Sequence, residues 1–273
     1  MNTMIWFITG ASKGFGREFA IAALERGDRV AATARDTKSL ADLSGRFGER
    51  VLPLRLDITD RAADFEAVGR VYDEFGGLDV VVNNAGYGHF GAFEELSEAD
   101  LRDQLETNLY GAVWITQAAL PFLRAQGSGH IVQVSSVGGL GAFANQSAYH
   151  ASKWALEAVS ESLAAEVGPL GIKVTIVEPA LFSTDWAGSS ARWSDKMTEY
   201  DYVREMMFAR RNSFAAGNPR AAAQALLEIV DSDNPPLRAL FGTAATAMIT
   251  ELYQQRLQTW RDWEAVSRRA QGG

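Results

Sequence analysis

Short apolar runs alternate with longer amphipathic stretches along the chain. A run of about four to eight apolar residues is typical of a buried strand, whereas apolar positions that recur every three or four residues are typical of a helix. The pattern predicts strands at 4–9, 29–34, 51–56, 79–82, 130–135, 172–178 and 237–241. It predicts helices near 14–26, 38–46, 61–75, 98–124, 148–168, 219–231 and 244–268.

This alternation of strand and helix indicates the fold class. Strand–helix–strand units are joined by right-handed crossovers and build a parallel sheet that helices cover on both faces. We therefore expect an α/β, doubly wound architecture around a mainly parallel, seven-stranded sheet. Two helix starts carry local signals: Ser97 with Asp100 resembles a capping box, and Asn218 precedes Pro219, a favourable first helical residue.

The first predicted strand runs into a glycine-rich turn. Gly10, Gly14 and Gly16 lie between the apolar run and the next predicted helix. Glycines let the backbone approach a ligand closely, and a helix N-terminus presents N–H donors and a positive dipole end to phosphate. The spacing is Gly-x-x-x-Gly-x-Gly, not the commoner Gly-x-Gly-x-x-Gly. An ordinary strand-to-helix turn is the alternative, but the flanking strand and helix favour a dinucleotide site.

A second pattern carries acid–base chemistry. Tyr149 and Lys153 are four residues apart on a predicted helix, and Ser136 lies thirteen positions before Tyr149. Residues at i and i+4 share one helix face, about 5 to 6 Å apart, so the ammonium can approach the phenol. A nearby positive charge favours ionisation of a phenol, whose ordinary pKa is about 10. Alone, such a pair is more often a surface feature.

The candidate residues gather at one end of the predicted sheet. Ligands of open α/β sheets bind beyond the carboxyl ends of the strands, near the point where the strand order switches. Each of the first six predicted strands is followed by one candidate residue. In chain order these are Gly10, Arg35, Asp57, Asn83, Ser136 and Pro179.

These residues resemble the sequence pattern of the short-chain dehydrogenase/reductase family over about residues 3–185. The matching segments are Thr9-Gly10-x3-Gly14-x-Gly16, Asp57, Asn83-Asn84-Ala85-Gly86, Asn108, Ser136, Tyr149-x3-Lys153, and Pro179 with Thr184. Ala180 departs from the pattern, since the family usually has Gly there, and this affects the turn beside the nicotinamide. The resemblance implies a Rossmann-type fold with one catalytic domain spanning 1–273. Its parts would be a dinucleotide-binding core of about 3–184, a substrate lid of about 185–215 and a C-terminal helix of about 244–268.

The resemblance also implies catalytic roles. Tyr149 would be the general acid in carbonyl reduction and the general base in alcohol oxidation. Lys153 would lower the pKa of Tyr149 and hold the nicotinamide ribose hydroxyls, and Ser136 would donate to the substrate oxygen. Asn108 would help to hold a water-linked proton path to Lys153, although without the resemblance a local bond to the backbone is the preferred interpretation.

The same resemblance implies which residues bind the cofactor. They are Gly10, Ser12, Lys13, Gly14, Phe15, Gly16, Arg35, Asp57, Ile58, Asn84, Ala85, Gly86, Tyr149, Lys153, Pro179 and Thr184.

The end of the second predicted strand indicates the type of dinucleotide. NAD-specific relatives place an acidic residue there to hold the ribose hydroxyls, but this chain has Ala34 followed by Arg35. Arg35 and Lys13 can both meet a 2′-phosphate, with Arg better suited to bidentate contact. Solvated surface charges are the alternative, and Asp36 lies past the usual acidic position. We expect NADP(H) as cofactor.

Residues 185–215 concentrate aromatic and Met side chains, which small-molecule pockets use. We expect a mobile lid that excludes water, and a largely apolar carbonyl or alcohol substrate. The candidate substrate contacts are His89, Trp186, Trp193 and Met207. The competing interpretation is that the aromatic residues pack an ordinary helix against the core.

Composition and charge narrow the possible partners, metal sites and location of the protein. The net charge of −8 disfavours nucleic acid as a partner, and the chain has no cysteine for a disulfide or thiolate metal site. Three scattered histidines make no metal-ligand pattern, so we expect no metal. No apolar run reaches 18 residues, and we expect a soluble, cytoplasmic protein with no membrane partner.

Apolar stripes on the helices predicted at 98–124 and 148–168 favour a homodimer or homotetramer by the family resemblance. The alternative is that both stripes face their own sheet.

Two functions remain open. The first is an NADP(H)-dependent oxidoreductase that interconverts a carbonyl and a secondary alcohol on a small, largely apolar substrate. The second is a non-catalytic, NADP(H)-sensing binding protein on the same fold. The presence of Ser136, Tyr149 and Lys153 favours the enzyme, because a sensor needs only the phosphate cradle. An isomerase or dehydratase is less favoured, since no separate sugar-nucleotide domain is indicated.

Overall fold

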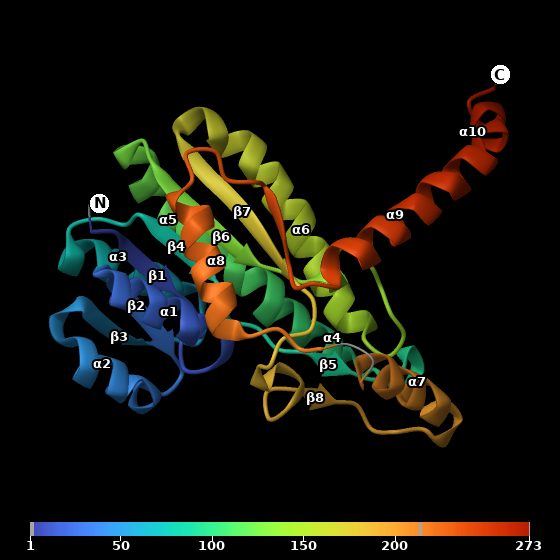
Figure 1. Cartoon of the computed structure of the whole chain (residues 1–273), viewed down its shortest axis with the longest axis horizontal. Helices are drawn as coiled ribbons and strands as arrows, with labels where there is room; N and C mark the ends of the chain where they lie inside the picture. Colours follow the sequence, from blue (N-terminus) through green and yellow to red (C-terminus); the bar gives the residue numbers. More distant parts are fainter. Residues whose placement is uncertain (1–2, 213–214, 273) are drawn as a thin grey trace.

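The computed structural model describes residues 3–212 and 215–272, and its centre is a seven-stranded parallel sheet (Figure 1). The strand order is β3-β2-β1-β4-β6-β7-β9, as expected for a doubly wound fold. The strands are β1 (Ile5–Ile8), β2 (Arg29–Ala34), β3 (Val51–Arg55), β4 (Val80–Asn83), β6 (Gly129–Val134), β7 (Ile172–Pro179) and β9 (Arg238–Phe241). The predicted Rossmann-type α/β class is confirmed.

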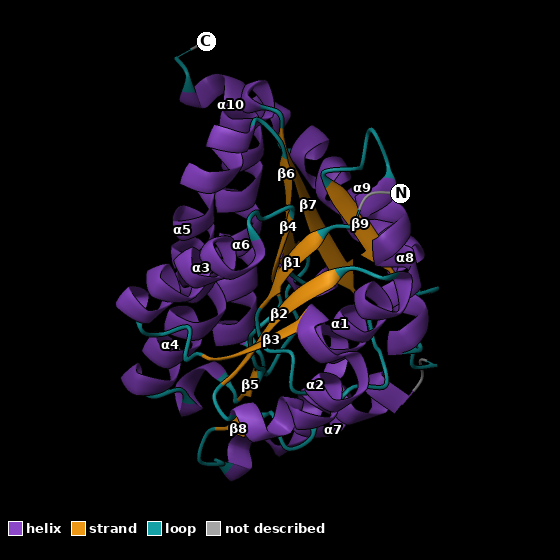
Figure 2. Ribbon diagram, turned by 90° about the vertical axis from the view of Figure 1, so that its left-hand side faces the viewer, coloured by secondary structure: helices purple, strands orange, loops and turns teal. Residues whose placement is uncertain are grey.

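Helices cover both faces of this sheet (Figure 2). One face carries α1 (Gly14–Arg26), α2 (Ala41–Phe47) and α8 (Pro219–Asp231). The other carries α3 (Arg61–Phe75), α5 (Gly111–Gln126) and α6 (Ser147–Val167). Successive residues of β1 alternate between the two layers: Trp6 and Ile8 are buried with α1 and α8, whereas Phe7 is buried with α3 and α5.

The strand order reverses between β1 and β4, which are direct neighbours in the sheet. From β1 the chain builds outward through β2 to β3, and from β4 it builds in the opposite direction through β6 and β7. Loops after β1 and β4 therefore diverge onto opposite faces and leave a crevice at their carboxyl ends.

The predicted helix over 98–124 is interrupted in the structure. It consists of α4 (Glu98–Leu105), a π-helical turn (Glu106–Tyr110) and α5. The predicted helix over 244–268 is α9 (Ala245–Asp262) followed by α10 (Glu264–Ala270), with the break at Trp263. These two helices project from the body of the protein (Figure 1). Helical periodicity alone does not reveal a wider turn or a one-residue break. The sequence pattern therefore predicted one continuous helix in place of α4 and α5, and one in place of α9 and α10.

The predicted helix starts are confirmed. Ser97 Oγ accepts a hydrogen bond from Asp100 N at 3.1 Å, and Asp100 Oδ2 accepts one from Ser97 N at 3.0 Å. Asn218 Oδ1 accepts a hydrogen bond from Arg220 N at 2.9 Å, with Pro219 as the first residue of α8. Each side chain satisfies an N–H that the helix itself leaves unpaired.

A second, two-stranded parallel sheet was not predicted. It pairs β5 (His89–Phe90) with β8 (Arg192–Trp193) below the main sheet (Figure 1). Strands of two residues carry no readable periodicity. This pairing ties the segment after β7 to the loop after β4, and α7 (Asp201–Asn212) follows it.

The apolar stripes of α5 and α6 mostly face their own sheet. Ile115, Leu156 and Val167 are buried in the core, whereas Val159 is exposed. For the buried members the alternative interpretation is therefore correct. Within the described ranges, no helix combines the length and apolarity needed to cross a membrane.

Candidate active site

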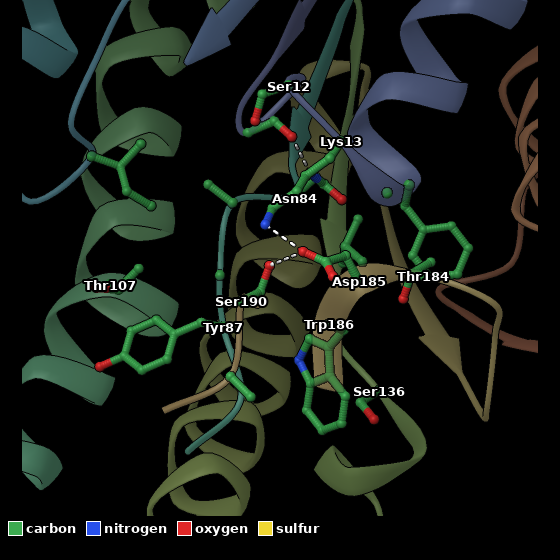
Figure 3. A pocket seen from close by; sticks show the side chains of 18 of the residues that line it. Ser12, Lys13, Asn84, Tyr87, Thr107, Ser136, Thr184, Asp185, Trp186 and Ser190 are labelled. Carbon is green, nitrogen blue, oxygen red and sulfur yellow. Dashed lines mark hydrogen bonds and ion pairs between the residues drawn. The ribbon is translucent and has the colours of Figure 1, made fainter. Parts of the chain in front are cut away.

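A cavity of about 670 Å³ opens at the carboxyl ends of β1, β2, β3, β4, β6 and β7. It contains all but one of the sixteen residues expected to bind the cofactor, the exception being Gly16. Of the expected catalytic residues, Ser136, Tyr149 and Lys153 line the cavity and Asn108 does not. Figure 3 shows part of the lining, with Ser136 and Trp186 on one side and Ser12 and Lys13 on another.

The glycine turn has the geometry of a phosphate cradle. Gly10 and Gly14 adopt positive φ values of 66° and 60°, which favour glycine. A Cβ on Gly16 would lie 2.3 Å from Asn84 Nδ2, so Gly16 permits close packing instead of lining the cavity. The first turn of α1 has no side-chain cap. Its N–H groups fit an anionic group such as a dinucleotide phosphate.

Asn84, which follows β4, and Thr9, which follows β1, brace this turn. Asn84 Nδ2 donates to Thr9 O at 2.9 Å and to Gly10 O at 3.1 Å. In return, Thr9 Oγ1 accepts from the backbone N of Asn84 at 2.9 Å and of Ala85 at 3.0 Å. These four bonds fix the two sides of the crevice to each other, so the cradle is held rigidly before any ligand enters.

Tyr149 and Lys153 share the inner face of α6, as their spacing predicts. Lys153 Nζ donates to Val134 O at 2.7 Å and lies 6.0 Å from the centre of the Tyr149 ring. Burial raises the pKa of Tyr149 to about 12, although the Ser136 hydroxyl partly lowers it. Burial lowers the pKa of Lys153 to about 8, although the Glu157 carboxylate partly raises it. Desolvation is thus the largest influence on the pKa of both groups.

Ser136 stands at the end of β6 with its hydroxyl near Tyr149. Its Oγ accepts a hydrogen bond from Gly138 N at 3.0 Å and donates to Pro179 O at 3.4 Å. Ala180, which replaces the family's usual glycine, does not adopt a positive φ. Its N–H donates to Phe241 O at 2.9 Å, so the turn beside Ser136 accommodates the extra methyl group.

Asn108 lies in the π-helical turn between α4 and α5 and is buried. Its Oδ1 accepts from Tyr87 N at 3.1 Å, and its Nδ2 donates to Tyr87 O at 3.0 Å and Ser152 Oγ at 3.1 Å. These partners are distant in sequence, so the side chain does not bond locally within its helix. Asn108 joins the loop after β4 to α6, close behind the face that carries Tyr149 and Lys153. The role of Ser152 in this contact could not be read from the sequence.

The cations expected at a 2′-phosphate both line the cavity. Arg35 is exposed at the end of β2, next to the buried Ala34. Lys13 pairs with Asp185, with Nζ 2.5 Å from Oδ2. The Asp36 carboxylate accepts a hydrogen bond from Lys38 N at 3.0 Å and so caps a short 3₁₀ turn. Asp36 does not line the cavity.

Of the four candidate substrate contacts, Trp186 alone lines the cavity. Trp186 lies in the cavity with its ring 4.9 Å from that of Tyr149. Trp193 stacks on Phe90 at 4.6 Å outside the cavity. His89 is buried with Nε2 2.8 Å from Ser194 Oγ, and Met207 Sδ lies 3.4 Å from Asn145 Nδ2. Burial lowers the pKa of His89.

The expected lid contains β8, α7 and two short 3₁₀ turns. Residues 213–214 of the expected lid lie outside the described residues. Asp185, Ser189 and Arg192 of the expected lid also line the cavity, although none of them was singled out as a site residue, because they match no motif. Within the described ranges, no group of three His, Cys, Asp or Glu side chains could hold a metal ion.

Comparisons with known proteins agree with this geometry. The family model described as short chain dehydrogenase matches residues 4–195. The chain is 41% identical over 273 residues to oxidoreductase BOA17 of Botryotinia fuckeliana, covering 97% of this chain and 99% of that protein. It is 35% identical over 246 residues to 3-ketodihydrosphingosine reductase of Bacteroides thetaiotaomicron, covering 89% of each. A solved short-chain dehydrogenase from Streptomyces avermitilis matches with a TM-score of 0.93 and 40% identity over 98% of both chains.

The chain therefore belongs to the short-chain dehydrogenase family of oxidoreductases.

Proposed function

We propose that the protein is an NADP(H)-dependent enzyme that interconverts a carbonyl group and a secondary alcohol on a small, largely apolar substrate. One observation carries the proposal: Ser136, Tyr149 and Lys153 line the same cavity as the glycine turn. The positive φ values of Gly10 and Gly14 and the uncapped start of α1 fit the phosphates of a dinucleotide. We take the whole chain, 1–273, as one catalytic domain.

A nicotinamide dinucleotide supplies the hydride when it is bound. Ser136 donates a hydrogen bond to the substrate oxygen and stabilises the negative charge that develops there. Tyr149 gives its phenolic proton to this oxygen during reduction and takes it back from the alcohol during oxidation. Burial raises the pKa of the phenol to about 12, so the acid form is present at neutral pH. Lys153, held by Val134 O, places its positive charge beside the phenolate that reduction leaves.

Two cations support the choice of NADP(H). Arg35 and Lys13 line the part of the cavity formed by the end of β2 and the glycine turn. Neither Ala34 nor Asp36 presents a carboxylate to the cavity there. A planar guanidinium can make bidentate contact with a 2′-phosphate, and the Lys13 ammonium adds a second charge.

The substrate class is supported by the position of Trp186. Its indole lies against Tyr149, so the substrate carbon next to the reacting oxygen would meet an apolar surface. Among the relatives, 3-ketodihydrosphingosine reductase acts on a keto compound by its name. We propose that this protein likewise reduces an apolar ketone, and we name no particular substrate.

The test is turnover of NADPH with a panel of apolar and polar ketones, followed by its absorbance. We expect the wild-type protein to reduce at least one apolar ketone. Tyr149→Phe should lower kcat by roughly 10²- to 10⁴-fold while the Kd for NADPH stays nearly unchanged. Tyr87→Phe is the matched control, because Tyr87 also lines the cavity and contacts Asn108 only through its backbone, which the substitution keeps. Binding of NADPH with no turnover in the wild type would favour the sensing protein instead.

A further inference from the structure

A buried acidic cluster lies behind the proposed catalytic residues. On α6, Tyr149, Lys153 and Glu157 follow one another at intervals of four residues, and all three are buried. The inner face of this helix packs against the end of β6. A Cβ on Gly139 would lie 2.7 Å from Ser135 Oγ and 2.8 Å from Glu157 Oε1. Glu157 is therefore next to the strand end that carries Ser136.

A second buried carboxyl reaches the cluster from β7. Glu178 directly precedes Pro179, whose carbonyl oxygen accepts the hydrogen bond from Ser136. Arg238 of β9 joins the two acids: its Nη1 bonds Glu157 Oε2 and lies 3.1 Å from Glu178 Oε1. Its Nη2 pairs with Glu161 at 2.7 Å. The Glu157 and Glu178 side chains are 5% and 1% exposed, whereas that of Glu161 is 64% exposed.

The hydrogen bonding of the buried pair is incomplete. Glu157 Oε1 and Glu178 Oε2 have no hydrogen-bond partner among the described residues. Two buried carboxylates that share one guanidinium leave a net negative charge in an apolar setting. Keeping that charge away from water costs free energy. One proton placed on the pair supplies a donor and removes that charge.

Electrostatics favour Glu178 as the holder of the proton. Burial raises the pKa of Glu157, and burial together with the charge on Glu157 raises the pKa of Glu178 to about 7. The ionised member is then Glu157, one helical turn from Lys153. Its carboxylate raises the pKa of the Lys153 ammonium against the effect of burial.

We propose that Glu157 and Glu178 hold one proton between them, and that the negative charge left on Glu157 keeps Lys153 protonated. Both are positioning residues, since they act through Lys153. Among the described residues, three other charged groups face the pair: Lys153 and Glu161 from α6, and Arg238 from β9. The consequence for catalysis rests on the proposed function, in which Lys153 must be charged.

The first experiment reads the two titrations directly. The protein is labelled with ¹³C at the glutamate carboxyl and at the ε-carbon of its five lysines, and NMR shifts are followed from pH 4 to 10. We expect one glutamate carboxyl to titrate near pH 7 and to disappear in Glu178→Gln. Lys153, assigned with Lys153→Met, should titrate about one unit lower in Glu157→Gln, because a close opposite charge shifts a pKa by about one unit or more.

Glu161→Gln is the matched control, because Glu161 pairs with the same arginine from an exposed position. It should leave both titrations in place. Glu178→Gln should remove the carboxyl titration without lowering the pKa of Lys153, since Glu157 keeps its charge. A wild-type protein in which every glutamate titrates below pH 6, or a Lys153 titration that is the same in Glu157→Gln and wild type, would overturn the proposal.

The second experiment separates this inference from the proposed function. The alkaline limb of the pH profile for ketone reduction should move to lower pH by about one unit in Glu157→Gln and stay fixed in Glu161→Gln. If no ketone is reduced at all, the proposed function fails while the NMR titrations still decide the inference. If ketones are reduced and both profiles coincide, the inferred influence on catalysis is wrong and the proposed function stands.

Discussion

Lys13 and Asp185 join the glycine turn to the segment after β7 through an ion pair of 2.5 Å. Asp185 also accepts hydrogen bonds from Ser189 Oγ at 2.5 Å and Ser189 N at 3.2 Å. The Lys13 ammonium, followed by these hydrogen bonds, holds the pKa of Asp185 well below its usual range. The carboxylate is therefore charged at working pH and competes with any phosphate for Lys13.

Asp185→Asn should tighten NADPH binding. Because the pair is solvent-exposed, its loss should lower the Kd for NADPH only about two- to fivefold. The Kd for NADH should not change, since NADH has no 2′-phosphate. Fluorescence titration with both dinucleotides measures this, and Ser189→Ala, which keeps the carboxylate, is the control. Weaker NADPH binding in Asp185→Asn would show that the pair assists binding and does not compete with it.

Arg35→Ala should reduce the preference for NADP(H). Arg35 is the exposed guanidinium at the end of β2, and loss of a charge-assisted contact of about 1.5–3 kcal/mol raises a Kd roughly 10- to 100-fold. The Kd for NADH should stay nearly constant. Lys38→Ala is the control, because Lys38 is a nearby cation that does not line the cavity. Tighter binding of NADH than of NADPH by the unmodified protein would contradict the assignment.

Features encoded locally were predictable from the sequence. The strands of the main sheet and the Asn218–Pro219 helix start depend on neighbouring residues, so periodicity and capping chemistry were sufficient. The glycine-rich turn was also recognised from its spacing, and Gly10 and Gly14 adopt positive φ there. The parallel sheet then places Ser136, which follows β6, at the same cavity as Tyr149 of α6.

Features that depend on burial and on remote pairing were not predictable. Desolvation by the whole fold raises the pKa of Tyr149 and outweighs the opposing effect of the Ser136 hydroxyl. Trp193 was grouped with Trp186 by composition, and His89 was chosen because it is close in sequence to the site. The pairing of β5 with β8 places both outside the cavity. The Glu157–Glu178 pair joins α6 to β7, and no sequence spacing indicates that contact.

Trp186→Ala should impair the use of bulky apolar substrates. Its ring lies 4.9 Å from that of Tyr149 in the cavity. Removing a buried aromatic surface costs roughly 1.5–3 kcal/mol of binding, so KM for a bulky ketone should rise about tenfold or more. The Kd for NADPH and the kinetics with small polar ketones should change little. Trp193→Ala, an aromatic deletion outside the cavity, is the control, and equal kinetics in both variants would exclude a substrate contact by Trp186.

Self-association remains a prediction and can be tested on the outer face of α6. Trp154, Ala158 and Ser162 are exposed there at helical spacing, beside the exposed Val159. We expect light scattering to give a multiple of 29.7 kDa for the wild type. Ala158→Glu should shift the protein to a monomer without loss of helix content, because the residue is solvent-exposed within one chain. A wild-type monomer at all micromolar concentrations would contradict the expected assembly.

The two directions of the reaction should differ in their pH dependence. Burial raises the pKa of Tyr149 to about 12, so nearly all of the phenol is protonated between pH 6 and 8. Carbonyl reduction needs this acid form and should be almost constant from pH 6 to 7, below the Lys153 pKa of about 8. Alcohol oxidation needs the phenolate, whose fraction rises about tenfold per pH unit below the pKa, so kcat for oxidation should climb steeply from pH 6 to 8.

Initial rates in both directions, with saturating NADPH or NADP⁺, measure this difference, and circular dichroism at each pH checks that the fold is intact. His150→Gln is a suitable control, because His150 neighbours Tyr149 and contacts Gly138 O at 2.9 Å but lies outside the cavity. Its profiles should match those of the wild type. If oxidation were instead constant and reduction fell steeply from pH 6 to 8, the general acid would have a pKa near or below 6, and Tyr149 could not be that acid.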